Sequence, residues 1–327
     1  MLKHYQLNIL ITSAGQRVSL VRSFQTELKK FFENGQVFTT DLNPILAPAC
    51  HVSDQSFTVP RVTSPEYIDY LLHLCLSNQV KLIVPTIDTE LLVLSENIAY
   101  FKQQGIHLLV SDPELVQQCR DKRQINHFFE EKGIRIPQQY TLESLKFPVF
   151  VKPYDGSLSK GIFTAYCAED IKPEHRVDPK LMFMEYIKPD DYDEFTVDCY
   201  YDKSSDLKCV VPRKRIFVRA GEVNKGVTKK NFIVREFNQK LKYIAGARGC
   251  LTIQVFMHKT EDKILGIEIN PRFGGGYPLS YLAGANYSQW VIQEYLLNQD
   301  IEEFSAWCDN LLMLRYDAEV LVNDYQD

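Results

Sequence analysis

The segment Glu268-Ile269-Asn270-Pro271-Arg272-Phe273-Gly274-Gly275-Gly276 combines a strand end with a group of polar and glycine residues. Glu268 and Asn270 are two residues apart, so in a strand both side chains lie on one face. A carboxylate and an amide oxygen are hard ligands of the kind that magnesium takes. Pro271 cannot extend the hydrogen-bonded ladder, so the strand ends there. The segment therefore predicts a magnesium site at a strand end, with Arg272 as a neighbouring cation.

The strand before this segment supports the same site. Thr252–Met257 and Ile264–Asn270 are separated by the polar turn 259–263, which is typical of an antiparallel hairpin. Gln254 then lies across the hairpin and can reach the metal. Gly274 and Gly275 let the backbone approach a ligand closely, which makes them weak candidates for substrate contacts. The alternative is an edge strand with a satisfied salt bridge, followed by a flexible loop.

A second signal is a strand that ends in a lysine and runs into a glycine- and serine-rich loop. Lys152 closes the apolar run that begins at Phe147, and a buried point charge needs an anionic partner such as a phosphate. Backbone N–H groups and hydroxyls of the loop can surround phosphate oxygens. The candidate phosphate contacts in the loop are Gly156, Ser157, Ser159, Lys160 and Gly161. The Walker A order is absent, and a plain β-turn is the alternative.

An apolar strand, 181–187, then leads into the acidic loop 189–194. The end of a strand can offer a backbone donor and acceptor to an adenine edge, and a nearby carboxylate can bind ribose hydroxyls. A strand followed by a solvated acidic turn is the alternative.

Residues 211–230 form a basic patch with seven Lys or Arg and one Glu. Arg213 and Arg215 are candidates for binding phosphate or a substrate carboxylate. A solvated hairpin face explains the patch equally well. The patch is short and lacks interleaved aromatic residues, which argues against nucleic-acid binding.

The first 110 residues alternate short β-rich apolar runs with amphipathic stretches, which predicts a parallel sheet with helical crossovers. The segment Asn8–Arg17 reads as a strand, a glycine turn and a helix. It lacks G-x-G-x-x-G, so we reject an NAD site. Asp88 and Glu90 follow a later strand, where open α/β sheets bind ligands. Both are weak substrate candidates, with a helix start as the alternative.

The composition is that of an ordinary globular protein, with 45% hydrophobic residues, 24% charged residues and a net charge of -5. Such a mild charge gives no reason to expect a nucleic-acid or membrane partner. No apolar run has the length of a signal-peptide core or a membrane span. Eight scattered cysteines without C-x-x-C spacing favour reduced thiols. We therefore predict a cytoplasmic protein.

The order of these motifs resembles the ATP-grasp superfamily, and most of all its branch that is similar to the large subunit of carbamoyl-phosphate synthase. The resemblance rests on Lys122, Lys152, the Gly/Ser loop, Met184-Glu185-Tyr186-Ile187, Glu194, Gln254 and Glu268–Arg272. It implies an α/β and α+β fold with a Rossmann-like parallel-sheet domain before a two-lobed ATP-grasp domain. The expected ranges are 1–112, then 113–300 with lobes 113–187 and 188–300, and a C-terminal segment 301–327 packed on the second domain.

The resemblance also implies a role for each matching residue. Lys122 and Lys152 contact phosphates, and the loop 156–161 closes over them. Glu185, Tyr186 and Ile187 line the adenine, and Glu194 holds the ribose. Glu268 and Asn270 bind magnesium, or manganese in its place, with Gln254 as a further ligand. Arg272 stabilises the phosphorylated intermediate.

The expected activity is that of an ADP-forming carboxylate–amine or carboxylate–thiol ligase with an acyl-phosphate intermediate. Arg213, Arg215 and Arg272 are the candidate catalytic residues, and the expected partners are small-molecule carboxylates and amines. Family members are often homodimers. Two alternatives stay open, which are phosphorylation of bicarbonate as in carbamoyl-phosphate synthase, and a non-catalytic nucleotide-binding protein.

Overall fold

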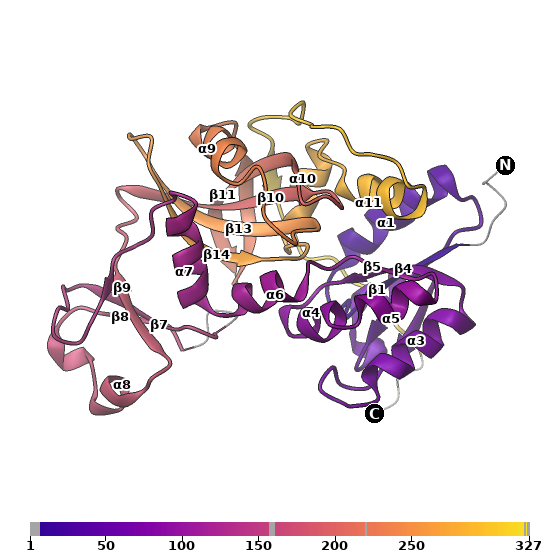
Figure 1. Cartoon of the computed structure of the whole chain (residues 1–327), viewed down its shortest axis with the longest axis horizontal. Helices are drawn as coiled ribbons and strands as arrows, with labels where there is room; N and C mark the ends of the chain where they lie inside the picture. The colour runs from indigo at the N-terminus through magenta and orange to yellow at the C-terminus, as the bar shows by residue number, and fades with distance from the viewer. Residues whose placement is uncertain (1–6, 157–160, 220, 324, 326–327) are drawn as a thin grey trace.

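The computed structural model describes residues 7–156, 161–219, 221–323 and 325. Three sheets follow one another across the molecule (Figure 1). A parallel sheet lies at one end, a small antiparallel sheet lies at the other, and a large antiparallel sheet lies between them. This arrangement confirms the predicted α/β and α+β fold class. No helix in the described ranges has the length and apolar character needed to cross a bilayer.

The N-terminal unit is a five-stranded parallel sheet in the order β3-β2-β1-β4-β5. The strands are β1 Asn8–Thr12, β2 Val37–Asp41, β3 Gln55–Thr58, β4 Val80–Pro85 and β5 His107–Leu108. All five residues of β1 are buried, as expected of a central strand with both faces covered. The connections are α1 Val18–Phe31, the 3₁₀ turn η2 Pro44–Leu46, α2 Pro48–Val52, α3 Tyr67–Ser77, α4 Asp88–Ser95 and α5 Ile98–Gln103.

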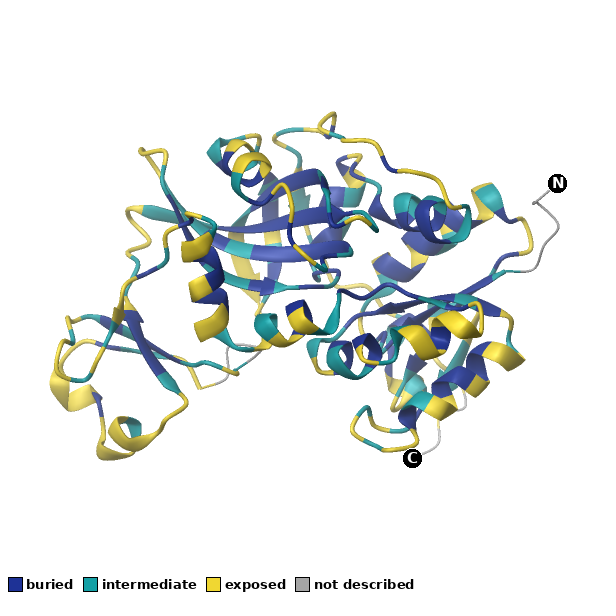
Figure 2. Ribbon diagram, in the orientation of Figure 1, coloured by how far each residue is buried: buried dark blue, intermediate teal, exposed yellow. Residues whose placement is uncertain are grey.

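The small sheet has the order β6-β9-β7-β8 and is antiparallel. Its strands are β6 Gln139–Tyr140, β7 Val149–Pro153, β8 Phe163–Ala165 and β9 Leu181–Glu185, with η3 Ala168–Asp170 and α8 Pro173–Val177 between the last two. Its core is small, with Val149, Val151, Ala165, Ile171 and Phe183 as the buried members. Figure 2 shows that most of the surrounding surface of this lobe is exposed or half-buried.

The large sheet is antiparallel in the order β14-β13-β10-β11-β12-β15. Its strands are β10 Tyr192–Tyr201, β11 Leu207–Arg219, β12 Glu222–Thr228, β13 Gly249–His258, β14 Ile264–Asn270 and β15 Leu312–Leu314. The accompanying helices are α6 Pro113–Arg120, α7 Lys122–Glu131, α9 Phe232–Lys240, α10 Tyr277–Leu282 and α11 Tyr287–Leu296. The predicted hairpin is confirmed, because β13 and β14 pair antiparallel with Gln254 opposite Glu268.

Helices α4 and α5 are separated by Glu96 and Asn97. Helix α9 begins after Asn231, whose side chain accepts a hydrogen bond from the Ile233 N–H at 3.1 Å. One expected domain boundary differs in the structure. Residues 113–136 were expected in the small lobe. Their apolar side chains, including Ile125 and Phe129, instead pack in the core of the large sheet.

One hydrophobic core joins the N-terminal unit to the large sheet. Helix α1 packs against α10 and α11, and Ile9, Phe24, Phe273 and Tyr287 belong to the same buried cluster. Phe273 contacts Phe24 edge-on with ring centroids 5.9 Å apart, and it contacts Tyr277 at 4.7 Å. The residue after Arg272 therefore anchors the end of β14 to the N-terminal unit.

We expect Phe273→Ala to lower the free energy of unfolding by about 3 to 4 kcal/mol, because a buried aromatic side chain at this joint is replaced by a cavity. Urea denaturation followed by circular dichroism measures the change. The exposed Tyr166 is the control, and Tyr166→Ala should change stability by less than about 0.5 kcal/mol. Equal effects of the two substitutions would contradict a joint centred on Phe273.

Candidate active site

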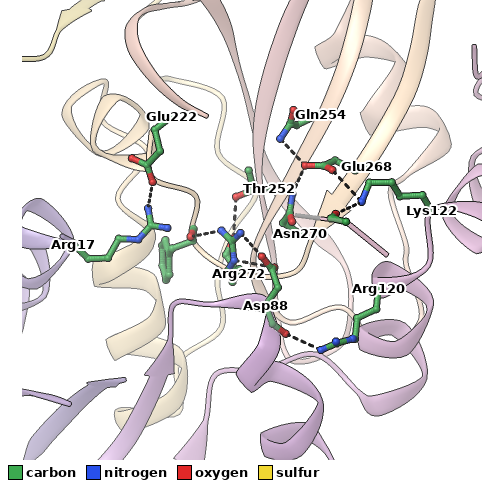
Figure 3. A network of polar contacts seen from close by, with 12 residues as sticks. Arg17, Asp88, Arg120, Lys122, Glu222, Thr252, Gln254, Glu268, Asn270 and Arg272 are labelled. Atoms are coloured by element: carbon green, nitrogen blue, oxygen red, sulfur yellow. Dashed lines mark hydrogen bonds and ion pairs between the residues drawn. The ribbon is translucent and has the colours of Figure 1, made fainter. Parts of the chain in front are cut away.

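The carboxylate of Glu268 is the centre of a polar cluster at the end of the β13–β14 hairpin (Figure 3). Gln254 Nε2 donates to Glu268 Oε1 at 2.7 Å, and Asn270 Nδ2 donates to the same oxygen at 2.9 Å. Between them in sequence, Ile269 is buried in the core of the large sheet. Strand alternation therefore places Glu268 and Asn270 on one face of β14 and Ile269 on the core face. The structure brings the three predicted metal ligands together.

Two lysines from different parts of the chain face this carboxylate. Lys122, the first residue of α7, places Nζ 4.0 Å from Glu268 Oε2 and donates to the Gly156 carbonyl at 2.5 Å. Lys152 on β7 is only 8% exposed. Burial lowers the pKa of Lys152 to about 8, with Lys122 adding to this effect and Glu268 opposing it. Both lysines thus act electrostatically on this carboxylate, and among the described residues Lys122 is the one within ion-pair distance of it.

The predicted phosphate loop is described only at its two ends. Ser157, Ser159 and Lys160 lie outside the described residues. Gly156 lies so close to Pro153 that a Cβ atom would stand 2.5 Å from the proline ring, and Gly161 has a φ of +71°. Each glycine is therefore required by its local backbone, the first by close approach and the second by the left-handed conformation.

The predicted ribose carboxylate, Glu194, lies on β10 and pairs with Arg215 on β11 at 3.2 Å. Burial raises the pKa of Glu194, Arg215 opposes this shift, and the charge of Glu268 adds to it. Arg215 Nη1 also donates to Thr196 Oγ1 at 3.3 Å. The buried Nε is the atom of the ion pair with Glu194, although it forms no hydrogen bond to a described atom. Arg215 is thus held beside Glu194 and Thr196.

The predicted adenine segment begins at the end of β9. Glu185 is exposed, and its carboxylate accepts a hydrogen bond from the Gln138 N–H at 3.1 Å. Tyr186 and Ile187 follow the strand and are half-buried. No described contact joins the Glu185 side chain to the cluster around Glu268, so its backbone rather than its carboxylate is the part available for an adenine edge.

Arg213 differs from the other candidate arginines. It is 1% exposed, and its guanidinium forms two hydrogen bonds of 2.8 Å to the fully buried Asp198. Ser280 Oγ adds a third donor to this carboxylate at 2.6 Å. Both charges are satisfied inside the protein, so we leave Arg213 out of the substrate contacts and regard it as a support beneath the site.

Arg272 connects the end of β14 to the N-terminal unit. It donates to both oxygens of Asp88, at 2.9 Å from Nε and 2.5 Å from Nη2, and Thr252 Oγ1 fixes its backbone carbonyl at 2.9 Å. The second weak candidate, Glu90, is fully buried and accepts hydrogen bonds from Tyr67 and Ser13. Asp88 therefore pairs with the residue that follows β14, whereas Glu90 fixes the turn after β1.

The run Gly274–Gly276 is glycine for reasons of space rather than of backbone conformation, since none of the three has a positive φ. A Cβ atom on Gly274 would stand 2.9 Å from the Thr252 side chain. One on Gly275 would stand 2.4 Å from the Glu222 carboxylate. One on Gly276 would stand 2.0 Å from the Arg213 guanidinium. The three glycines let the side chains of Thr252, Glu222 and Arg213 pack directly against the backbone after β14.

Three residues that sequence reasoning missed lie beside Gly275. Arg17 Nη1 is 3.3 Å from Glu222 Oε1, and Arg315 Nη1 is 2.9 Å from Glu222 Oε2. Arg315 also donates to the Gly275 carbonyl. Glu222 is the single acid of the basic patch and Arg17 ends the strand–glycine–helix segment, so two of the three stood in segments that had been singled out.

The donor set around Glu268 fits magnesium bound together with a nucleotide. Magnesium in such sites takes one or two protein carboxylates and fills its remaining positions with phosphate oxygens and water. Glu268 supplies the carboxylate. If the side-chain amide groups of Gln254 and Asn270 rotated by half a turn, their oxygens would take the positions of the nitrogens that now donate to Glu268. The described residues contain no cluster of three or more His, Cys, Asp or Glu that could bind a metal without such help.

Comparison with known proteins agrees with this organisation. Residues 9–109 match the family model "PylC-like, N-terminal domain", and residues 177–314 match "ATP-grasp in the biosynthetic pathway with Ter operon". The second of these matches confirms the resemblance to the ATP-grasp superfamily. No curated protein matches the sequence.

Three solved structures illustrate the shared fold. The biotin carboxylase domain of a Hydrogenobacter thermophilus 2-oxoglutarate carboxylase, a dimer with MgADP, ADP and bicarbonate, has a TM-score of 0.68 at 14% identity, covering 94% of this chain and 74% of its own. An L-amino acid ligase from Bacillus licheniformis has a TM-score of 0.65 at 16% identity, and the match covers 90% of this chain and 75% of the ligase. N5-carboxyaminoimidazole synthetase from Staphylococcus aureus has a TM-score of 0.68 at 12% identity, and the match covers 92% of this chain and 79% of the synthetase.

We expect Lys152→Met to stabilise the nucleotide-free protein at neutral pH by at most about 3 kcal/mol, because the pKa of Lys152 falls from 10.5 to about 8 on folding. The unfolded chain binds more protons between about pH 8 and 10.5, so the stability of the parent protein rises with pH across that window. The difference in stability between the variant and the parent protein should therefore become smaller over the same pH range. Urea titrations at several pH values measure it.

The exposed Lys146, at the approach to the same strand, is the matched control. Lys146→Met should leave stability unchanged at every pH. A Lys152→Met variant that is less stable than the parent protein at pH 7 would show that the ammonium is already satisfied without a ligand.

Proposed function

We propose that this ATP-grasp protein is an ATP- and magnesium-dependent ligase that joins a carboxylate to an amine or a thiol and releases ADP and phosphate. The observation that carries the proposal is the pair of lysines, Lys122 and the buried Lys152, around the single carboxylate of Glu268. Together these side chains have an excess positive charge in a partly desolvated cleft. The triphosphate of ATP would compensate that charge.

The family resemblance supports an assignment of the nucleotide contacts. Lys122 and Lys152 bind phosphate oxygens. Glu194 binds the ribose hydroxyls, and the backbone of Tyr186 and Ile187 lines the adenine. Glu268, Asn270 and Gln254 hold magnesium, which when bound neutralises phosphate charge and orients the triphosphate.

The chemistry then follows in two displacements. An oxygen of the substrate carboxylate attacks the γ-phosphorus of ATP, a new C(O)O–P bond forms, the bond from the γ-phosphorus to the bridging oxygen breaks, and ADP leaves. An amine nitrogen or a thiol sulfur next attacks the acyl carbon, phosphate leaves with the C–O bond electrons, and the nucleophile loses its proton. Arg272 and Arg215 are the chain's cations for the charge that develops on the transferred group.

We expect Glu268→Gln to reduce ADP release by about a hundredfold or more, because it removes the carboxylate on which Gln254, Asn270 and the lysines converge. A coupled assay of ADP formation with magnesium-ATP measures it. Glu261→Gln, at the exposed tip of the same hairpin, is the matched control and should retain the activity of the parent chain. Full turnover by Glu268→Gln would refute the proposed metal site.

Bicarbonate is the alternative acceptor, since the Hydrogenobacter domain was crystallised with it. A screen of ADP release over carboxylates, each with and without amines and thiols, separates the two reactions. We expect turnover to need both an organic carboxylate and a nucleophile. ADP release with bicarbonate alone would favour the alternative. A melting temperature that magnesium-ATP fails to raise would exclude nucleotide binding, and with it a purely nucleotide-sensing role.

A further inference from the structure

Three arginines from distant parts of the chain, Arg17, Arg272 and Arg315, lie close together beside the proposed metal site. Arg17 ends the turn after β1, Arg272 follows β14, and Arg315 follows β15. Two carboxylates face them, Glu222 between Arg17 and Arg315, and Asp88 on Arg272. Figure 3 shows Arg17 and Glu222 on one side of Arg272, with Glu268 and Lys122 on the other. This acceptor-side cluster has one more cation than it has anions.

The positive charges of the cluster act on one another through a partly desolvated space. Burial lowers the pKa of Arg17, and the neighbouring Arg272 and Arg315 lower it further, while Glu222 and Asp88 oppose the shift. Burial by itself would raise the pKa of Glu222, but Arg17, Arg315 and Arg272 together lower it below its usual value. All three guanidinium groups therefore act on one carboxylate position.

The Glu222 carboxylate shows what kind of group fits that position. One oxygen forms an ion pair with Arg17 Nη1 at 3.3 Å and the other accepts a hydrogen bond from Arg315 Nη1 at 2.9 Å, so a carboxylate spans the two guanidinium groups with one oxygen on each. Charge-assisted contacts of this kind hold carboxylates against arginine. Glu222 itself is at the first position of β12 with its side chain 45% exposed, whereas that of Arg17 is 20% exposed. The Glu222 side chain can therefore move into solvent while Arg17 and Arg315 keep their positions.

We propose that the acceptor substrate carries a second, non-reacting carboxylate, which binds between Arg17 and Arg315 and takes the place of the Glu222 carboxylate. The inference rests on the proposed ligase function, and it specifies the substrate class as dicarboxylic acids. Arg272 separates this site from Glu268, so one carboxyl group is held at the arginines while the other faces the nucleotide. Glu222 acts as an internal competitor that keeps the arginines paired until the substrate arrives.

The test is equilibrium binding, measured by isothermal titration calorimetry in the presence of magnesium and a non-hydrolysable ATP analogue. The probes are succinate and glutarate, each compared with its own monoamide, which keeps the size and removes one charge. We expect each diacid to bind about tenfold or more tightly than its monoamide, which corresponds to one charge-assisted hydrogen-bonded pair. Arg17→Gln and Arg315→Gln should both abolish this preference.

Glu222→Gln distinguishes a binding site from a purely structural ion pair. Removal of the internal competitor should strengthen diacid binding by about tenfold, whereas a structural ion pair would only lose stability when it is broken. Arg219→Gln is the matched control, since Arg219 pairs with Asp317 outside the cluster and its loss should leave diacid affinity unchanged.

Failure of the inference and failure of the proposed function give different results. If magnesium-ATP raises the melting temperature but no diacid binds better than its monoamide, or if Glu222→Gln weakens diacid binding, the carboxylate site is refuted and the ligase proposal remains. If magnesium-ATP has no effect on the melting temperature of the parent chain, the nucleotide site itself is refuted.

Discussion

The arrangement of this protein depends on an electrostatic constraint at Glu268. A single carboxylate at the end of β14 accepts hydrogen bonds from Gln254 and Asn270 and faces Lys122, while Lys152 lies buried close by. Burial of an ammonium group costs free energy unless an anion compensates it, and one carboxylate cannot compensate two cations. The folded protein is therefore less stable without a ligand than with a polyanion bound at this position. Binding sites often lower the stability of the free protein in this way.

The end of β14 distributes its consecutive residues among different environments. Strand alternation places Glu268 and Asn270 on one face of β14 and Ile269 in the core. After Pro271 the chain leaves the sheet, and Arg272 reaches Asp88 of the N-terminal unit while Phe273 enters the core shared with α1. A single short segment thus fixes Glu268 and Asn270, the joint to the N-terminal unit and Arg272 relative to one another. Displacement of any one of these would disturb the others.

Sequence reasoning was successful where local pattern determines the structure. The hairpin and the facing of Gln254 and Glu268 follow from strand periodicity and a polar turn, and both are confirmed. The two arginines of β11 show where such reasoning ends. Arg213 and Arg215 share a face by periodicity, yet the first is covered by the protein and paired with Asp198, and the second lies where the strand emerges from the core. How deeply a side chain is buried depends on the tertiary fold and cannot be predicted from residue spacing.

The same limit explains the acceptor-side cluster. Its members lie at the start, in the middle and near the end of the chain, so only the closed fold brings them together. The glycine run gave a partial signal, because three consecutive glycines without positive φ imply close neighbours on several sides. Those neighbours are Thr252, Glu222 and Arg213, two of them charged. The absence of side chains in this run leaves room for charged groups of both units to lie together at the end of β14, at the joint between the units.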